Sequence, residues 1–513
     1  MIVRLALRSL ATRPLRTAVL SIGFGLGIAV MAELLGVGEV ILQQAHSPAL
    51  AGGGDELVTG GFGPLESGRF VMSSVLGSDR FRTRIRTVAP SRRATLYLMG
   101  PDGSIPVNVR GGIPSRDAAI GDPEVAGQPG WVDTSDDTRW LNPAPGDLLR
   151  AMDRFHPVPS DSRAAEAPDR SAPAKPSGAG QKSWAEWLYF NARSQDGALR
   201  FYLTFLATAP DASGARPTYV RLQLNRNGKT TNYAAFASVD AQALLDRAPD
   251  LDVGGNHVRL DSSGTYRITL ALASEPRTPY SEPRTPTLES RVPSPESRVK
   301  GELTLTPAPG RSFPPATIHG ARGWMSGYVV PVLSGTFSGR LLVDGQEMVV
   351  DGADGYHDHN WGFWEGVTWQ WGQVANSDLS IVYGRVFPPP EVADRNRVPG
   401  ALAVIGRDGL IAFSTDVSIT EDDQHGTPRT VIVQSRDRQL TLMLRLTVSE
   451  GVRTPLALTQ ATSRKSQVAS QSTVAAGTPM FLQLGGTYQV TGRAGDRDLN
   501  FTARGSAETF RPR

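Results

Sequence analysis

Short runs in which apolar and polar residues alternate occupy much of the chain beyond residue 183. The runs "WLYFNAR" and "LRFYLTFLA" stand on either side of Gln195, Asp196 and Gly197. Alternation with a period of two is typical of a strand with one buried face, and Asp-Gly favours a tight turn, so this stretch predicts a β-hairpin. Further alternating runs follow at the spacing expected of an antiparallel barrel or sandwich, at residues 218–225, 231–239, 257–261, 265–273 and 301–307.

A second series of alternating runs begins near Arg322 and continues to the C-terminus. Two series of similar length predict an all-β protein with two antiparallel β-barrels in tandem, over residues 184–321 and 322–513. The first series is interrupted at residues 274–298, where "SEPRTP" is repeated. Because proline cannot donate to a strand ladder, this insertion predicts a solvated loop.

Two less regular segments precede the predicted barrels. Residues 55–130 contain β-like runs at 80–90 and 92–112, the second with a turn at Pro101–Gly103, and they predict a small β-rich module. Residues 131–183 predict a connecting segment. Much of it is a linker rich in proline, alanine and serine, a composition that cannot bury enough apolar surface to order itself.

The first 45 residues carry a different pattern, an uncharged run from residue 17 to residue 32. Extended past Glu33 to about residue 37, it reaches the roughly 20 residues with which a helix crosses a bilayer. The arginines near this run all precede it: Arg4, Arg8, Arg13 and Arg16. Because cytoplasmic flanks are rich in arginine, residues 1–45 predict a single-pass transmembrane anchor in the cell inner membrane, with the bulk of the chain in the periplasm. A signal peptide cleaved near Ala49–Ala51 and a buried soluble helix are the alternatives.

Charge and composition narrow the function classes. The 53 basic and 50 acidic side chains nearly cancel, leaving a formal net charge of +3, so nucleic acid is not an expected partner. The absence of cysteine excludes disulfides, thiolate metal sites and a cysteine nucleophile. The chain also lacks a dinucleotide fingerprint, a phosphate-binding loop and a nucleophile elbow, which argues against nucleotide-driven and serine-hydrolase chemistry.

The stretch "DGYHDHNWG" concentrates polar and aromatic side chains in one predicted strand. Successive side chains of a strand point to opposite faces, so His357 and His359 share one face, while Tyr356, Asp358 and Asn360 share the other. A metal site on the histidine face needs a third ligand from elsewhere in the chain. The candidates are a carboxylate or one of five histidines, His46, His156, His257, His319 and His425.

The other face of this strand predicts an acid site. Inside an apolar barrel the charged form of a carboxyl group is disfavoured, so Asp358 can stay protonated near neutral pH and act as a general acid. Tyr356 and Asn360 would orient it or hold a water molecule. Aromatic ring faces line apolar ligands and stabilise carbocations. Four of the nine tryptophans lie close by, Trp361, Trp364, Trp369 and Trp371.

Plainer interpretations of these residues stay open. Asp358 can be a polar plug that is satisfied by backbone amides or a histidine, with the tryptophans as ordinary core. The stretch "EWLYFN" poses the same choice. There Glu186 is either a pocket carboxylate or a rim charge, and Trp187, Tyr189 and Asn191 are either ligand-lining residues or core.

Two longer stretches, taken together and in order, resemble the two halves of the AttH/CrtC-like family, which includes carotenoid 1,2-hydratase (hydroxyneurosporene synthase). They are "SWAEWLYFNARSQDGALRFYLTFL" and "VVDGADGYHDHNWG" followed by "WQWGQV", and the resemblance covers roughly residue 131 to the C-terminus. It implies two lipocalin-like barrels and an apolar, often isoprenoid, ligand. In the hydratases a Tyr-x-Asp protonates a terminal double bond and water captures the cation. The resemblance therefore implies that Asp358 is the proton donor and Tyr356 its support.

The chain departs from the hydratases at "GYVVP", where Gly327 and Val329 stand in place of a His-x-Trp pair. This departure favours the AttH-like branch, encoded beside ABC exporters, and the N-terminal stretch resembles the first transmembrane helix of ABC exporter permeases. The resulting hypothesis is a membrane-anchored protein that binds a lipid or isoprenoid and acts as a hydratase or cyclase through Asp358, without a cofactor. The alternatives are a non-catalytic lipid-binding module that assists ABC exporter subunits, and a metal hydrolase that uses His357 and His359.

Overall fold

Strands make up most of the described structure. The computed structural model describes residues 84–100, 103–122, 144–159, 183–275, 298–423, 426–454 and 480–511, with a few isolated positions elsewhere. These residues belong to two units, the smaller of which has a hairpin of β1 (Ser91–Gly100) and β2 (Gly103–Gly112) and a helix α6 (Pro114–Ala119). The hairpin predicted around residues 101–103 is thereby confirmed, whereas residues 84–90 form no strand.

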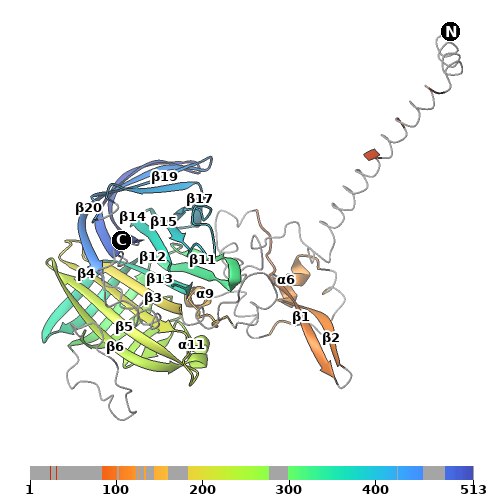
Figure 1. Cartoon of the computed structure of the whole chain (residues 1–513), viewed down its shortest axis with the longest axis horizontal. Coiled ribbons are helices and arrows are strands. Elements are labelled where there is room, and N and C mark those ends of the chain that lie inside the picture. Colours follow the sequence, from red (N-terminus) through yellow and green to blue (C-terminus); the bar gives the residue numbers. More distant parts are fainter. Residues whose placement is uncertain are drawn as a thin grey trace, which may run out of the picture. The chain divides into compact units, whose positions relative to one another are not determined.

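The first sheet of the larger unit closes on itself as barrel 1 (Figure 1). Antiparallel ladders run in the order β3, β4, β5, β6, β9, β10, β12, β13 and back to β3, and β7, β8 and β11 pair alongside. Closure leaves the ring without a free edge. The bounds are α9 (Pro145–Met152), β3 (Trp184–Arg193), β4 (Leu199–Thr208), β5 (Ala215–Arg226), β6 (Lys229–Asp240), α11 (Ala241–Arg247), β7 (Leu251–Val253), β8 (Asn256–Leu260), β9 (Tyr266–Ser274), β10 (Val299–Pro307), β11 (Phe313–His319), η2 (Ala321–Gly323), β12 (Met325–Val343) and β13 (Gln346–Phe363).

The second sheet is a nearly closed barrel, barrel 2. Its order is β17, β16, β15, β14, β22, β21, β20, β19 and β18, so that its two end strands follow each other in the chain. The bounds are β14 (Thr368–Ala375), β15 (Leu379–Phe387), β16 (Ala401–Gly406), β17 (Gly409–Ser414), β18 (Val417–Glu421), β19 (Thr430–Asp437), β20 (Leu440–Thr454), β21 (Met480–Ala494) and β22 (Arg497–Arg511). The all-β fold with two barrels, predicted from alternation, is confirmed, but β12 and β13 belong to barrel 1, so barrel 2 begins at β14 and not near residue 322.

Alternation along β3 illustrates how the sequence builds both faces of barrel 1. Leu188 and Phe190 are fully buried in the barrel core, and each contributes roughly 1.5–3 kcal/mol by burial. Trp187, Tyr189 and Asn191 alternate with them and lie on the outer face. Tyr189 belongs to a second apolar cluster, which joins the two barrels.

This second cluster covers the outer face of β13 and β3 with barrel 2. Its members from barrel 1 are Tyr189, Tyr202, Val330, Leu333 and Tyr356, and those from barrel 2 are Trp371, Val382, Ala403 and Ile405. Figure 1 shows β12 and β13 running beside β14 and β15 at this junction. Tyr356 and Asp358 on the outer face of β13 are therefore enclosed between two barrels, where water is scarce.

Residues 144–159, which the sequence predicts only as part of a connecting segment, pack into barrel 1. Leu149, Met152 and Phe155 belong to its buried core. The approach requires glycine at Gly146, because a Cβ there would overlap the carbonyl oxygen of Asp261. The segment that follows α9 consequently carries further side chains into the interior of the barrel.

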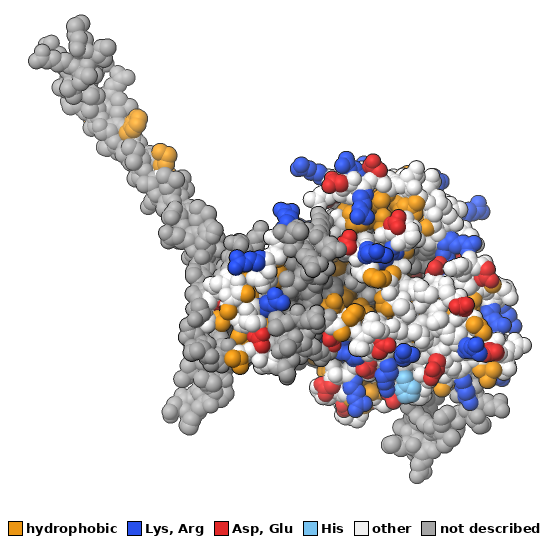
Figure 2. Space-filling model, turned by 180° about the vertical axis from the view of Figure 1, so that it is seen from behind, with side chains coloured by type: hydrophobic (Ala, Val, Ile, Leu, Met, Phe, Trp, Pro, Cys, Tyr) orange, Lys and Arg blue, Asp and Glu red, His pale blue; other side chains and the backbone are white. Residues whose placement is uncertain are grey.

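Within the described part of the chain, no helix is both long enough and apolar enough to cross a bilayer. The anchor predicted at residues 1–45 lies outside the described residues, apart from Leu15, Phe24, Val30 and Met31. Most of the predicted linker and of the "SEPRTP" insertion also lie outside them. On the face seen in Figure 2, basic and acidic side chains of the described residues are interspersed.

Candidate active site

Strand β13 carries polar side chains on both of its faces, with the alternation that the sequence predicts. One face turns toward barrel 2 and forms the junction site, made of Tyr189, Tyr328, Tyr356, Asp358, Asn360, Trp371 and Glu508. The other face turns into barrel 1 and forms the barrel cluster, made of Asp153, His156, Glu186, Arg216, His357 and His359. One strand therefore contributes to two separate polar sites.

Asp358 accepts two hydrogen bonds from its own strand. Tyr356 Oη donates to Oδ2 over 2.7 Å, and Asn360 Nδ2 donates to Oδ1 over 2.8 Å. Tyr328 Oη lies 3.0 Å from Tyr356 Oη and receives the indole N–H of Trp371 over 2.6 Å. Because an indole N–H can only donate, the proton of Tyr328 is free to point at Tyr356, and that of Tyr356 at Asp358. The carboxyl group stands at the end of a directed hydrogen-bond chain.

The surroundings of Asp358 favour its protonated form. Burial raises the pKa of this carboxyl well above its ordinary value of 3.8, and the negative charge of Glu508 raises it further. Hydrogen bonds from Tyr356 and Asn360 act in the opposite direction without offsetting the burial. Asp358 is only 6% exposed, so water does little to restore the charged form. The environment of Asp358 therefore favours the protonated form, in which the carboxyl group can donate a proton.

A second carboxyl group reaches the junction site from barrel 2. Glu508 on β22 is half-buried, and its Oε1 accepts the hydroxyl proton of Tyr189 over 2.8 Å. Gln483 Nε2 donates to the same tyrosine oxygen over 3.1 Å. Burial raises the pKa of Glu508 to about 7, although its hydrogen bonds oppose the shift. The site thus combines two carboxyl groups whose pKa values are both raised by burial.

A row of partly exposed tryptophans begins beside the acid. Trp187 lies opposite Asn360 in the ladder between β3 and β13. Its ring centroid is 4.5 Å from that of Trp364, which in turn lies 5.9 Å from that of Trp369. Such a row offers ring faces to an apolar molecule that extends away from Asp358.

The barrel cluster is an ionic network without exposed surface at its centre. Asp153 Oδ2 lies 2.9 Å from His357 Nε2, and its Oδ1 lies 3.0 Å from His359 Nδ1. The other nitrogen of His359 is 3.1 Å from Glu186 Oε1. Glu186 Oε2 in turn lies 3.4 Å from Arg216 Nη1. Each carboxylate in the barrel therefore faces cationic or hydrogen-bonding partners.

Part of this cluster has the composition of a metal site. His156, Glu186 and His359 each offer one ligand atom, and these atoms lie within 4.8 Å of one another. However, Glu186 Oε1 already accepts the backbone N–H of His156 and faces its Nδ1, both at 2.8 Å. Arg216 faces the other oxygen of the same carboxylate. The set could hold a metal ion, but its donors and charges are already matched by protein groups.

The charges in the barrel cluster support one another. Burial lowers the pKa of His359, but its hydrogen bonds to Asp153 and Glu186 outweigh this effect and raise it to about 9. Burial has the opposite effect on the two carboxyl groups and raises the pKa of Asp153 and of Glu186. The histidines around them outweigh it and hold both pKa values at about 2. At neutral pH two carboxylates face Arg216 and a protonated His359.

These shifts predict how stability depends on pH. The pKa of His359 is about 9 in the folded chain and 6.5 ordinarily, so its contribution is complete below about pH 6.5 and is lost as the pH rises through 9. The lowered pKa values of Asp153 and Glu186 give contributions that are present above about pH 4.5 and lost as the pH falls toward 2. We expect the free energy of unfolding of the full chain in urea to be highest between about pH 5 and 6.5. It should fall by up to about 3 kcal/mol toward pH 9. His359→Gln should flatten the alkaline side; an unchanged alkaline decline in that variant would contradict the assignment.

The structure divides the predicted site residues between the two faces. Those on the junction side are Tyr356, Asp358, Asn360, Trp187, Tyr189, Asn191, Trp364, Trp369 and Trp371. Those inside barrel 1 are Glu186, His357, His359 and Trp361, all fully buried. Glu186 is consequently neither the pocket carboxylate nor the rim charge that the sequence analysis allows, because alternation in β3 sends it into the barrel.

Sequence reasoning missed several polar members of both clusters. Tyr328 stands between Gly327 and Val329, the two positions at which the chain departs from the hydratase pattern. A Cβ on Gly327 would overlap the Trp361 ring, and Val329 is fully buried in barrel 1, so neither position supplies a polar group to the junction site. The alternation in β12 could have indicated Tyr328, but nothing local distinguishes Glu508 from a surface acid.

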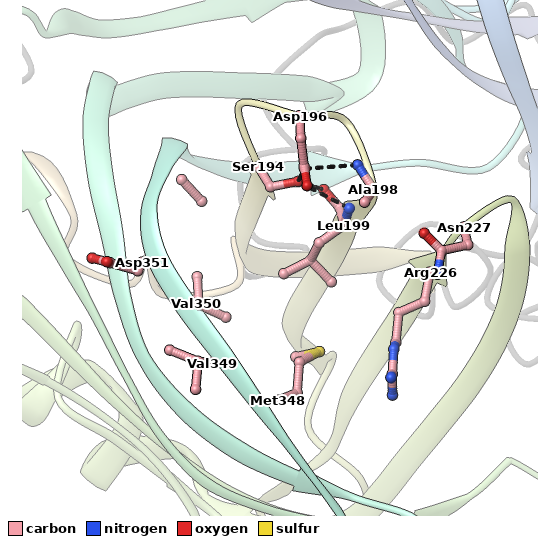
Figure 3. A pocket seen from close by; sticks show the side chains of 11 residues that line it. Ser194, Asp196, Ala198, Leu199, Arg226, Asn227, Met348, Val349, Val350 and Asp351 are labelled. Atoms are coloured by element: carbon pink, nitrogen blue, oxygen red, sulfur yellow. Dashed lines mark hydrogen bonds between the residues drawn. The ribbon is translucent and has the colours of Figure 1, made fainter.

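A pocket of about 400 Å³ lies away from both clusters (Figure 3). It is bounded by the turn between β3 and β4, the turn between β5 and β6, and the first half of β13. Its lining residues are Ser194, Asp196, Ala198, Leu199, Arg226, Asn227, Met348, Val349, Val350, Asp351 and Ala353. Asp196 accepts hydrogen bonds from the Ser194 hydroxyl and the Ala198 backbone N–H, which close the β3–β4 turn. These polar groups of the pocket therefore stabilise the local structure.

An all-β protein of two antiparallel barrels, with a buried carboxyl group between them, is the class that this fold and site define. No protein-family model matches the chain, and no curated protein matches its sequence. Among solved structures it is similar to an AttH-like protein of Nitrosomonas europaea, at 16% identity over 69% of this chain and 99% of that chain, with a TM-score of 0.40.

The chain is also similar to two further solved structures. CghA matches at 12% identity over 67% of this chain and 95% of that chain, with a TM-score of 0.39. Kievitone hydratase of Nectria haematococca matches at 13% identity over 66% and 94%, with a TM-score of 0.38. The AttH-like resemblance expected from the two motifs is thus met among solved structures. Likeness at this level transfers no activity to the chain, whose chemistry must follow from its own residues.

Proposed function

We propose that this protein binds an apolar, isoprenoid-like molecule between its barrels and hydrates or cyclises it by general acid catalysis from Asp358. The observation that carries the proposal is a buried carboxyl group, with its pKa raised by burial, that adjoins a row of tryptophans. Protonation of a double bond creates a carbocation. The ring faces beside Asp358 can stabilise this cation without acting as nucleophiles.

The proton transfer can be written with named groups. The O–H bond of Asp358 breaks as a C–H bond forms at the less substituted carbon of a double bond, leaving a tertiary cation. Tyr356 and Asn360 already donate to the two carboxyl oxygens, so the carboxylate that remains is stabilised as it forms. Water then bonds to the cation and loses a proton, and the net reaction adds one water molecule. In a cyclisation, a second double bond of the same molecule takes the place of water.

The proposal retains the membrane location that the N-terminal pattern predicts. An isoprenoid partitions into a bilayer, so a chain anchored in the inner membrane with periplasmic barrels would meet its ligand at the membrane surface. The support is the uncharged run after four arginines, together with the resemblance of this stretch to ABC exporter permeases. ABC exporter subunits are accordingly the proposed partners.

A non-catalytic carrier is the second candidate function. The observation that favours it is that both oxygens of Asp358 already accept hydrogen bonds, as in a satisfied polar plug. In that case Tyr356, Asp358 and Asn360 would only shape the ligand site, and turnover would be absent. The two functions differ in the expected effect of replacing Asp358 by a residue without an acidic proton: an enzyme would lose turnover, whereas a carrier would show only a change in affinity.

The first test identifies what the chain carries. We expect the full chain to fractionate with membranes and, after detergent extraction, to retain an isoprenoid or another apolar lipid in native mass spectrometry. Trp369→Ala shortens the tryptophan row and should lower ligand retention about tenfold. Phe413→Ala is the matched control, because Phe413 is an exposed aromatic residue of β17. Stoichiometric zinc without lipid would contradict the proposal and favour the barrel cluster as the site.

A further inference from the structure

Two buried polar groups on the junction side of barrel 1 lack hydrogen-bond partners among the described residues. They are the hydroxyl of Tyr202 and the amide nitrogen of Asn191, in side chains that are 5% and 7% exposed. The two residues are register partners in the ladder between β3 and β4. An unpaired buried hydroxyl or amide costs about 1–3 kcal/mol, so both groups are expected to bind a water molecule or a ligand hydroxyl.

Tyr189 connects Glu508 to this pair of unsatisfied groups. The Tyr189 ring stacks on the Tyr202 ring with centroids 6.3 Å apart, and the Tyr189 hydroxyl donates to Glu508. Burial raises the pKa of Tyr202 to about 12, and the charge of Glu508 contributes to the rise. Tyr189 therefore contacts Glu508 through its hydroxyl and Tyr202 through its ring.

The two carboxyl groups of the junction site come from different barrels. Asp358 stands on β13, whereas Glu508 stands on β22 and is held there by register with Gln483 on one side and Trp371 on the other. Each carboxyl group has its own hydrogen-bond donors. A hydration needs both a proton donor and a proton acceptor, placed at the two ends of one double bond.

We infer that Glu508 is the general base of the junction site and that Tyr202 and Asn191 hold the water molecule from which it takes a proton. The inference rests on the proposed function, because it assigns the second half of the same hydration. Asp358 gives a proton to one carbon of the double bond. The oxygen of the held water bonds to the other carbon, and one of its O–H bonds breaks as the proton moves to the Glu508 carboxylate. Glu508 is half-buried and releases this proton to solvent, while Asp358 regains one.

Isotopes separate the two halves of the reaction. The full chain in detergent is incubated with geranylgeraniol in D₂O, and separately in H₂¹⁸O, and products are read by mass spectrometry. Deuterium in recovered alkene reports reversible protonation by Asp358, and ¹⁸O in a tertiary alcohol reports capture of water. Glu508→Gln should lower the ¹⁸O-alcohol about 10²-fold while deuterium persists. Glu450→Gln is the matched control, because Glu450 pairs with Arg200 on the same side and is more exposed.

Tyr202→Phe provides a second variant if Glu508→Gln does not fold. Loss of a hydroxyl without a protein partner should leave the unfolding midpoint unchanged or higher, yet lower the ¹⁸O-alcohol about tenfold. Full ¹⁸O-alcohol formation in Glu508→Gln would overturn the inference. Equal loss of both labels would overturn it too, because Glu508 would then serve Asp358 alone. A wild-type chain that gives neither label refutes the proposed hydration itself, whereas both labels in the wild type with an unaffected Glu508→Gln refute only the role of Glu508.

Discussion

Replacing Asp358 with asparagine is expected to reduce deuterium incorporation into geranylgeraniol by at least about 10²-fold, while the affinity for the ligand changes little. Asparagine matches the protonated carboxyl group in shape and in lack of charge. It therefore preserves the packing between the barrels but has no acidic proton to give. Because burial holds the wild-type group in its neutral form, the substitution creates no new charge defect. Chemistry and binding should therefore separate.

Asp354→Asn is the matched control for this experiment. Asp354 precedes Asp358 on the same face of β13, but its side chain is 70% exposed and lies 4.0 Å from Arg193. It should retain both turnover and binding, since an exposed ion pair contributes little. Wild-type turnover in Asp358→Asn would favour the carrier function. An equal loss in both variants would mean that the effect is not specific to the buried acid.

Alternation predicts much of this fold because it reports directly on burial. In β3 and in β13 from Ala353 onward, residues of one parity fill barrel 1 and those of the other parity lie on its outer face, which is why the separation of His357 from Asp358 follows from sequence alone. What alternation does not give is the identity of each face. Both faces of β13 are buried from Gly355 to His359, so neither could be assigned to solvent or ligand there without knowing the position of barrel 2.

Glu186 shows why a charge can be misplaced by sequence reasoning. Carboxylates are rarely buried fully unless they are paired, and its partners lie far away along the chain. His156 comes from the segment after α9, Arg216 from β5 and His359 from β13. Only the tertiary structure brings these groups together. No local sequence pattern therefore indicates that the charge of Glu186 will be compensated.

The segment that comprises α9 and the residues after it was not predicted, for a related reason. Residues 144–159 precede a long linker and contain many polar groups, so composition assigns them to the connection. Leu149, Met152 and Phe155 nevertheless all enter the core of barrel 1. Asp153 follows them inside, where it has partners that the linear sequence does not reveal.

Substitution of Asp153 by alanine should therefore be among the most destabilising changes in barrel 1. It removes the carboxylate that faces His357 at 2.9 Å, His359 at 3.0 Å and the hydroxyl of Tyr266 at 3.1 Å. Loss of one partner from a buried ionic network costs about 3–5 kcal/mol, because the remaining charge stays in the interior without compensation. We expect the urea midpoint to fall accordingly, followed by tryptophan fluorescence and circular dichroism.

Asp252→Ala is the control that isolates burial as the cause. Asp252 also faces a histidine, His257, at 3.5 Å, but its side chain is 57% exposed, so its loss should cost less than about 1 kcal/mol. The difference between the two variants measures the barrel cluster against an ordinary surface pair. The prediction fails if Asp153→Ala has a urea midpoint no lower than that of Asp252→Ala. Asp153 would then not stabilise the packing of the segment after α9 against barrel 1, and the ionic network would add nothing to the stability that the surrounding apolar packing gives.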